Sequence, residues 1–206
     1  ENNGIRIGSD SENTTLKNSI VDSAGYDGID LDSDSIVVEN VTSRANDDAG
    51  IYINSDSNFV RNVEVTGNQY GIELNYADSN NLSGITSYSY NVGIELDDAG
   101  EYGANIINNS VIRDNTDYGI TLYDDSLSNK IYNNFFRNSD NVYFEENNQN
   151  SWNVSNQTGN RIKLTENKIG GNYWANSSGK GYSDTCTDSD KDGYCDNPYD
   201  VEDSQA

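Results

Sequence analysis

One short motif recurs along most of the chain at a nearly constant spacing. A glycine, an isoleucine, a variable residue and a leucine or isoleucine follow one another at six places. The copies begin at Gly4, Gly28, Gly50, Gly71, Gly93 and Gly119, with spacings of 24, 22, 21, 22 and 26 residues. Two degenerate copies, Val142 to Phe144 and Ile162 to Leu164, extend the series. A period of roughly 20 to 50 residues indicates a stacked repeat architecture.

Each repeat contains short stretches in which apolar and polar residues alternate, separated by Asn, Asp, Gly and Ser. Alternation with a period of two is typical of β-strands, and no amphipathic helix of about ten residues can be drawn. This combination predicts an all-β fold, a right-handed, single-stranded parallel β-helix over residues 1–168. A leucine-rich repeat has a different Leu and Asn spacing, and a propeller blade needs about 40 residues.

The composition agrees with a narrow stacked core. Hydrophobic residues make up 33% of the 206 residues, against roughly 45–50% in ordinary globular chains. Such a polar chain could instead be disordered, but the periodic apolar pattern, 15 Tyr and a single Pro argue against disorder. Because a β-helix fills its core with a few inward side chains from each rung, a low apolar content is sufficient.

A second series of residues recurs out of phase with the first, each with an apolar residue two positions earlier. Its members are Asn18, Asn40, Asn62, Gly84, Asn108 and Asn133. We expect their amides to form a ladder at one corner, hydrogen-bonded from rung to rung. We also expect the glycine that heads each Gly-Ile-x-Leu segment to occupy a corner that requires a positive φ.

The charge balance excludes several kinds of partner. The chain carries 12 Lys and Arg against 35 Asp and Glu, a formal net charge of −23, and it has no His or Met. Such a surface repels nucleic acids and anionic membranes, and favours cations or sugars. The absence of His removes the usual general base near neutral pH and the commonest transition-metal ligand, and the absence of Met removes the thioether used for copper(I). No run of about 18 apolar residues predicts a membrane span.

Residues 169–206 are expected to form a C-terminal cap over the last rung, and they contain an acidic loop. The predicted Ca²⁺ ligands are the carboxylates of Asp188, Asp190, Asp192 and Asp196 and the carbonyl of Tyr194. Hard oxygen donors at this spacing suit Ca²⁺. The twelfth position, where an EF-hand has Glu, is Tyr199, so Asp200 is a candidate substitute. The alternative is a solvated acidic turn without metal.

The two cysteines, Cys186 and Cys195, bracket this loop. A disulfide between them is the simplest interpretation and requires an oxidising compartment, whereas the alternative is a pair of reduced thiols. Asn-x-Ser/Thr sequences also permit glycosylation. The candidate acceptors outside the expected ladder are Asn13, Asn81, Asn153, Asn156 and Asn176.

The variable residue of each Gly-Ile-x-Leu segment should point outward and stack on its counterparts in the next rungs. This stack reads Arg6, Asp30, Tyr52, Glu73, Glu95, Thr121 and Tyr143. Tyr52, Glu73 and Glu95 form a candidate ligand face, because a tyrosine can contact a sugar ring and paired carboxylates bind cations or perform acid/base chemistry. The alternative is a row of solvated side chains, and no catalytic residue is assigned.

The chain resembles the NosD-like parallel β-helix repeat family, especially its archaeal cell-surface members. The resemblance rests on the rungs, on Gly170-Gly171-Asn172-Tyr173-Trp174, and on the acidic loop ending in Asp196-Asn197-Pro198-Tyr199. It implies a secreted β-helix related in fold to carbohydrate-binding proteins and sugar hydrolases. The copper role of the bacterial namesake is not carried over, because this chain has neither His nor Met.

Two hypotheses of function follow. The first is a non-enzymatic extracellular or cell-surface structural protein, a glycosylated, calcium-stabilised rod. No cap precedes the first repeat, so the rod is expected to self-associate into a layer, sheath or filament. The second is a carbohydrate-active module that binds or cleaves an acidic polysaccharide through its tyrosines and carboxylates.

Overall fold

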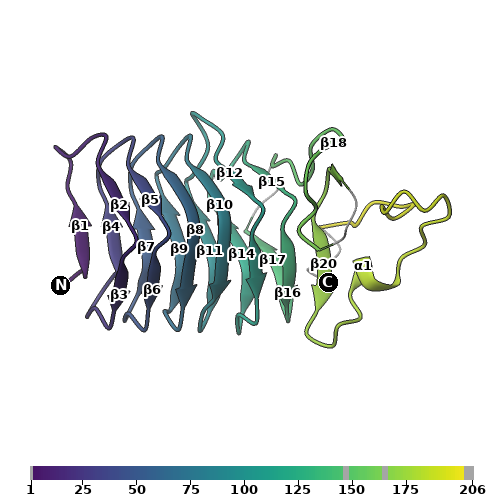
Figure 1. Cartoon of the computed structure of the whole chain (residues 1–206), viewed down its shortest axis with the longest axis horizontal. Helices are drawn as coiled ribbons and strands as arrows, with labels where there is room; N and C mark the ends of the chain where they lie inside the picture. Colours follow the sequence, from purple (N-terminus) through teal and green to yellow (C-terminus); the bar gives the residue numbers. More distant parts are fainter. Residues whose placement is uncertain (1, 146–148, 164–166, 202–206) are drawn as a thin grey trace.

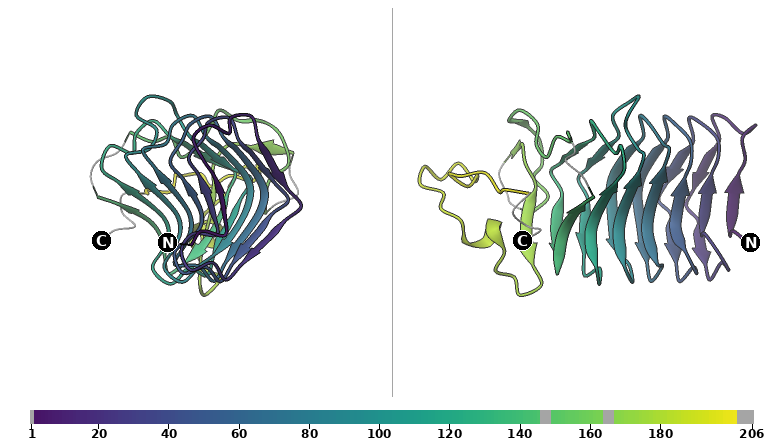
Figure 2. Two further views of the ribbon diagram at one scale, coloured as in Figure 1. Left: turned by 90° about the vertical axis from the view of Figure 1, so that its left-hand side faces the viewer. Right: turned by 180° about the vertical axis from the view of Figure 1, so that it is seen from behind.

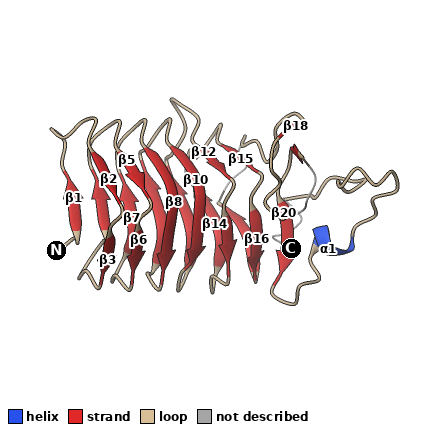
Figure 3. Cartoon of the chain, viewed as in Figure 1, coloured by secondary structure: helices blue, strands red, loops and turns tan. Residues whose placement is uncertain are grey.

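The computed structural model describes residues 2–145, 149–163 and 167–201 and consists almost entirely of short strands (Figure 3). The strands are stacked as successive rungs along the long axis of the molecule, with the N-terminal rung at one end and the acidic loop at the other (Figure 1). Seen along that axis, the rungs follow one another around a common interior (Figure 2). The predicted parallel β-helix is therefore confirmed.

The Gly-Ile-x-Leu segments form a parallel sheet of seven strands, here called sheet A. Its strands, in spatial order, are β1 (Ile5–Ile7), β4 (Ile29–Leu31), β7 (Ala49–Ile53), β9 (Tyr70–Asn75), β11 (Val92–Asp97), β14 (Tyr118–Tyr123) and β17 (Asp140–Phe144). The degenerate copy around Val142 pairs in register with Ile120. The prediction that the other degenerate copy forms a further rung is wrong, because Ile162 and Lys163 lie outside any strand. Leu164 lies outside the described residues.

Eleven further strands form sheet B. Its main path is β2 (Thr15–Lys17), β5 (Val37–Glu39), β8 (Phe59–Thr66), β10 (Asn81–Tyr88), β13 (Val111–Arg113), β16 (Phe135–Asn138) and β20 (Tyr173–Asn176). The strands off this path are β3 (Ile20–Asp22), β6 (Thr42–Arg44), β12 (Ile106–Asn108) and β15 (Lys130–Tyr132). A small antiparallel pair, β18 (Gln157–Thr158) and β19 (Lys168–Ile169), and one short helix, α1 (Tyr182–Thr185), complete the structure. Among the described residues, no helix is long and apolar enough to cross a membrane.

The core is one column of buried apolar side chains between the two sheets. The Ile and Leu of each Gly-Ile-x-Leu segment point inward, because alternate residues of a strand face opposite sides. Ile51 and Ile53, for example, are fully buried and pair in register with Ile72 and Leu74 of the next rung. Because equivalent aliphatic side chains stack on one another in successive rungs, few apolar residues are enough to fill the narrow interior.

The glycines that head these segments do not have the expected positive φ. They are needed because neighbouring rungs approach each other closely at this corner. A Cβ atom built on Gly50 would lie 2.7 Å from the carbonyl oxygen of Gly71 and 2.9 Å from a methyl group of Val65. The requirement is therefore steric, and not conformational as the sequence suggested.

The recurrent asparagines mark a backbone corner, and some are hydrogen-bonded from rung to rung as expected: Nδ2 of Asn40 donates to Oδ1 of Asn18 at 3.4 Å, and Nδ2 of Asn133 donates to Oδ1 of Asn109 at 2.6 Å. Asn18, Asn40 and Asn62 have φ of 52°, 54° and 52° and are exposed. This left-handed conformation, which Asn tolerates better than most residues, bends each rung within sheet B. In the fifth rung the left-handed residue is Asn109, and the predicted Asn108 lies in β12 instead.

The buried amide ladder is formed by another set of asparagines, which lie one residue before strands of sheet B. Its fully buried members include Asn58, Asn80, Asn105 and Asn129, and also Asn134 before β16. The backbone N–H of Asn58 donates to Oδ1 of Asn80, and that of Asn80 donates to Oδ1 of Asn105, both at 2.8 Å. These amides satisfy backbone groups that the corner would leave unpaired, so polar side chains can be buried there.

The segment predicted as the C-terminal cap adds β20 to sheet B, parallel to β16. Trp174 of β20 stacks on Phe136 of the last core layer, with ring centroids 4.7 Å apart. Tyr199 in turn stacks on Trp174 at 4.8 Å. These aromatic rings cover the apolar end of the core that the last rung would otherwise expose to water.

Candidate functional site

The outer face of sheet A carries the predicted outward stack in register. Arg6 pairs with Asp30, Asp30 with Tyr52, and Tyr52 with Glu73. The row continues from Glu73 through Glu95 and Thr121 to Tyr143. Because adjacent parallel strands lie about 4.8 Å apart, each side chain in this row is within contact distance of the next.

A groove of about 700 Å³ opens on this face over the N-terminal rungs. Tyr52 forms part of its lining, and the charged lining residues are Arg6, Asp27, Asp30, Asp32, Asp48 and Glu73. Among the described lining residues, five carboxyl groups therefore face a single guanidinium group. A groove with this balance attracts cations and repels polyanions.

Asp30 is, with Asp27, one of the two buried carboxyl residues of this groove. Its side chain is only 9% exposed. Oδ2 accepts a 2.6 Å hydrogen bond from Asn3 and lies 3.3 Å from Nε of Arg6, whereas the buried Oδ1 has no hydrogen-bond partner among the described residues. Burial, followed by the nearby Asp32 carboxylate, raises the pKa of Asp30.

Glu73 and Glu95 lie side by side at the centre of the face. Burial, followed by the charges of Glu95 and Asp48, raises the pKa of Glu73 to about 8. Burial also raises the pKa of Glu95, although Thr121 Oγ1 donates a 3.1 Å hydrogen bond to Glu95 Oε2 and opposes that rise. Glu73 is therefore mostly protonated at neutral pH, so it can donate a hydrogen bond as well as accept one.

Tyrosines border this carboxyl pair on both sides. Tyr52 precedes Glu73 in the row, and burial together with the Glu73 charge raises its pKa to about 12. Beyond Glu95, the ring of Tyr143 lies 5.1 Å from that of Tyr118 and 5.6 Å from that of Tyr123. We call Tyr118, Tyr123 and Tyr143 the tyrosine cluster. The rings of these tyrosines offer flat, partly apolar surfaces.

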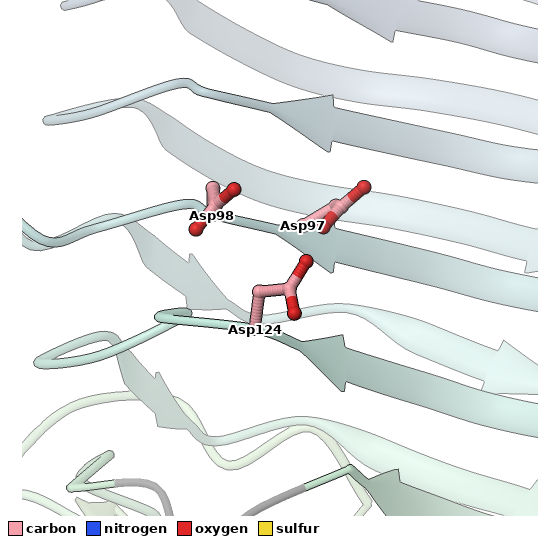
Figure 4. A group of neighbouring side chains, drawn as sticks. All are labelled: Asp97, Asp98 and Asp124. Carbon is pink, nitrogen blue, oxygen red and sulfur yellow. The ribbon is translucent and has the colours of Figure 1, made fainter.

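A group of three carboxylates lies at one edge of the same face (Figure 4). Asp97 ends β11, Asp98 follows it, and Asp124 follows β14 in the next rung. Their oxygen atoms lie within 4.8 Å of one another, and burial together with Asp124 and Asp98 raises the pKa of Asp97. Oxygen donors grouped in this way could hold a hard cation. Sequence reasoning missed this group, although Asp pairs follow Leu96 and Tyr123 in both rungs.

The C-terminal acidic loop contains a second group of this kind, closed by the predicted disulfide between Cys186 and Cys195. Oxygens of Asp188, Asp190 and Asp196 lie within 4.8 Å of one another. Oδ2 of Asp188 accepts a 3.0 Å hydrogen bond from the Gly193 N–H, and its buried Oδ1 has no partner among the described residues.

The remaining predicted calcium ligands lie beside that group. Asp192 is not one of its three carboxylates, and its Oδ1 accepts a hydrogen bond from the Tyr194 N–H at 2.9 Å. The guanidinium of Arg161 lies 3.8 Å from the centroid of the Tyr194 ring and donates to the carbonyl of Gly193. Arg161 therefore fastens the acidic loop to the body of the β-helix.

The candidate glycosylation sites differ in exposure. Asn13, Asn153 and Asn156 are exposed, as an acceptor must be. Asn81 lies half-buried in β10. Oδ1 of Asn176 accepts hydrogen bonds from the N–H groups of Ser178 and Lys180.

Comparisons with known proteins agree with the fold. A family model described as periplasmic copper-binding protein (NosD) matches residues 1–179. The crystal structure of the pectate lyase Pel9A is similar, with a TM-score of 0.53 and 16% sequence identity over 70% of this chain. The matched region spans 45% of that pectate lyase, and at this identity the likeness concerns the fold alone. Among curated proteins, no match is found.

The residues of this chain do not fit copper. The whole sequence contains no His or Met, and both cysteines are joined in the disulfide. Copper sites in proteins rely on imidazole, thiolate or thioether ligands, whereas the acidic groups here offer only hard oxygen donors. These groups are suited to Ca²⁺ or to ligands with hydrogen-bond donors.

Proposed function

The chain belongs to the NosD family, and we propose that its ligand is a glycan bound on the outer face of sheet A. The family is described as periplasmic copper-binding proteins, but the donor atoms of this chain do not suit copper. The observation that carries this proposal is the outer face of sheet A, where the groove over the first rungs ends at Glu73 and the row of outward side chains continues through Glu95 to Tyr143 of the tyrosine cluster. Sugar rings pack on aromatic faces, and sugar hydroxyls hydrogen-bond to carboxyl groups.

The charge of the groove restricts the kind of glycan. An acidic polysaccharide, as the sequence suggested, would bring further negative charge close to the carboxyl groups of the groove, among them Asp32 and Asp48. Repulsion between like charges at short range disfavours such a ligand. We therefore propose a glycan that is neutral or positively charged. The groove also favours this function over the structural rod that the sequence favoured.

Loss of one aromatic ring from the tyrosine cluster tests the proposal. Tyr143→Ala removes the ring that contacts both Tyr118 and Tyr123, and we expect glycan affinity to fall about tenfold or more, equivalent to about 1.4 kcal/mol. The measurement is a screen of neutral and amino-sugar oligosaccharides, followed by isothermal titration calorimetry on the tightest ligand. Tyr102→Ala is the control, because Tyr102 is 87% exposed and lies in the loop between β11 and β12. Equal affinities of the two variants would contradict a role for this face.

The acidic loop is the proposed site of Ca²⁺. Asp188, Asp190 and Asp196 would supply carboxylate ligands, with the Tyr194 carbonyl and Asp192 as the remaining predicted donors. Three carboxylates this close repel one another unless a cation neutralises them. A disulfide-closed calcium loop suits an oxidising compartment, in agreement with a family described as periplasmic, and we propose an extracellular or cell-surface location.

Self-association into a rod is a second proposal. Among the described residues β1 pairs with β4 alone, so one edge of sheet A is open to another strand. Stacking of two copies through this edge would make the protein a structural element of a layer or filament. Sedimentation velocity of the 206-residue chain over a range of concentrations, with Ca²⁺ and with EDTA, decides it. A monomer under every condition would rule this role out.

A further inference from the structure

We propose that the groove over the first rungs of sheet A binds the protonated amino group of an amino sugar, so that the ligand is a glycan carrying free amines. This inference rests on the proposed glycan-binding function and narrows it to one class of ligand. It is carried by Asp30, by the charge of the groove, and by the way the carboxyl groups are distributed within it.

The unsatisfied oxygen of Asp30 identifies the contact. Its side chain is about nine-tenths buried and lines the groove, and Oδ1 has no hydrogen-bond partner among the described residues. A buried carboxylate oxygen without a partner is costly, and the cost is removed by a donor that brings positive charge. An ammonium group meets this need, because it carries three N–H donors and a unit charge.

The carboxyl groups that line the groove outnumber its cationic groups. Arg6 is its single guanidinium among the described lining residues, and Asp30 and Asp32 share it, with Nε 3.3 Å from Oδ2 of Asp30 and 2.8 Å from Oδ2 of Asp32. Other arginines pair with carboxylates away from this groove, as Arg44 does with Asp22 and Arg137 with Asp114. The groove is therefore a local concentration of negative charge, which attracts cationic ligands.

An extended cationic ligand fits this groove better than a metal ion. Among the described residues, the carboxylate groups close enough to share an ion are those around Asp97 and Asp188, and neither lies in the groove. The carboxyl groups of the groove are spread over three rungs instead, those of β4, β7 and β9, from Asp27 to Glu73. A ligand with several amines along its length can reach more than one of them.

A sugar fits better than a basic peptide. Extended peptides commonly bind by adding a strand to an open sheet edge. Beneath the centre of the groove no such edge exists, because β4 is paired with both β1 and β7, and β7 with both β4 and β9. The open edge of β1 lies at the end of the groove, and the pentalysine probe described below tests it. The groove instead presents Tyr52, whose ring offers a flat apolar surface to a pyranose ring.

A pair of oligosaccharides that differ only in charge tests the inference. The probes are the pentamer of β-1,4-linked glucosamine and its fully N-acetylated counterpart, titrated calorimetrically at pH 6 in low salt. We expect the glucosamine pentamer to bind at least tenfold more tightly, and its affinity to fall as salt is added. Asp30→Asn should remove this preference, and Asp48→Asn should reduce it. Asp10→Asn, an exposed residue outside the groove, is the charge-matched control and should leave it unchanged.

The possible outcomes are distinct. Equal binding of both pentamers by the unmodified protein overturns the amino-sugar inference and leaves the glycan-binding function standing. Binding of neither pentamer, together with a negative glycan screen, overturns the proposed function itself. A pentalysine peptide that binds as tightly as the glucosamine pentamer overturns the assignment to sugars. If Asp30→Asn fails to fold, as judged by circular dichroism, Asp48→Asn carries the test, and an unchanged preference in that variant overturns the inference.

Discussion

The pKa of Glu73 shows how neighbouring carboxyl groups on the outer face of sheet A affect a single residue. Its carboxyl group is partly buried among Glu95, Asp48 and Asp27, and these surroundings hold its pKa at about 8. In the unfolded chain the same group has a pKa of about 4.5. The folded protein therefore binds a proton at Glu73 that the unfolded chain releases between these two values. The stability associated with Glu73 is present at low pH and is lost as the pH rises toward 8.

Replacement of Glu73 by Gln should remove this pH dependence. Gln resembles the protonated form, so the variant should lose less stability than the unmodified protein between about pH 4.5 and 8. At pH 8 to 9 we expect Glu73→Gln to be more stable by about 1–3 kcal/mol, after allowance for solvent screening. Urea unfolding at several pH values measures the difference, with exposed Glu101→Gln as the control. Parallel curves for the unmodified protein and Glu73→Gln would show that Glu73 is not perturbed.

The buried amide ladder allows a second test at the level of single residues. Oδ1 of Asn105 accepts from the backbone of Asn80, and its Nδ2 donates to the carbonyl of Ala77, both at 2.8 Å. Asn105→Ala should therefore destabilise the fold by about 1–3 kcal/mol for each buried group left unpaired. Asn54→Ala, at an exposed position, is the control. Equal chemical-denaturation midpoints would show that the ladder contributes little.

Within the repeated element, neighbouring rungs approach each other so closely at the first glycine of each Gly-Ile-x-Leu segment that a larger residue would strain the fold. Gly50→Ala would force a Cβ atom against the Gly71 carbonyl oxygen, which belongs to the backbone and cannot turn aside. We expect a loss of about 1–3 kcal/mol or more in unfolding free energy. Gly25→Ala is the matched control, because no atom lies within 4 Å of the added methyl group and Gly25 has no positive φ. A melting temperature for Gly50→Ala equal to that of Gly25→Ala would contradict this steric explanation.

Within the repeated element, the sequence predicts the register of neighbouring strands correctly, but it does not predict the roles of the residues at the corners. The period of the Gly-Ile-x-Leu segments places Tyr52, Glu73 and Glu95 side by side, since the strand period fixes both the outward face and the neighbour. The roles of corner residues depend on backbone conformation, which composition does not determine. A spacing of 22, 25 and 24 residues among Asn58, Asn80, Asn105 and Asn129, one residue before each strand, would have identified the buried ladder. The groove could not be foreseen, because it depends on which side chains converge across rungs.

For the whole molecule, Ca²⁺ should stabilise the end that carries the acidic loop. Arg161 and Tyr199 connect this loop and the segment after it to the body, so ordering the loop should be felt by the last rungs. At a Ca²⁺ concentration about 100 times the dissociation constant we expect about 2.7 kcal/mol of stabilisation and a melting temperature about 5–10 °C higher than in EDTA. Asp188→Asn should abolish the increase and Asp10→Asn should not. Identical melting curves in Ca²⁺ and EDTA would contradict the proposed Ca²⁺ site in this loop.

The stacking of rungs also determines how the molecule responds to force. The strands lie across the long axis, so the hydrogen bonds that join neighbouring rungs run along it (Figure 1). Tension between the N-terminal rung and the acidic loop would load these bonds one rung after another, because each rung contacts only its neighbours. The molecule would then lengthen in small steps, as rungs detach one at a time from one end. It would extend at low force while the remaining rungs stay folded.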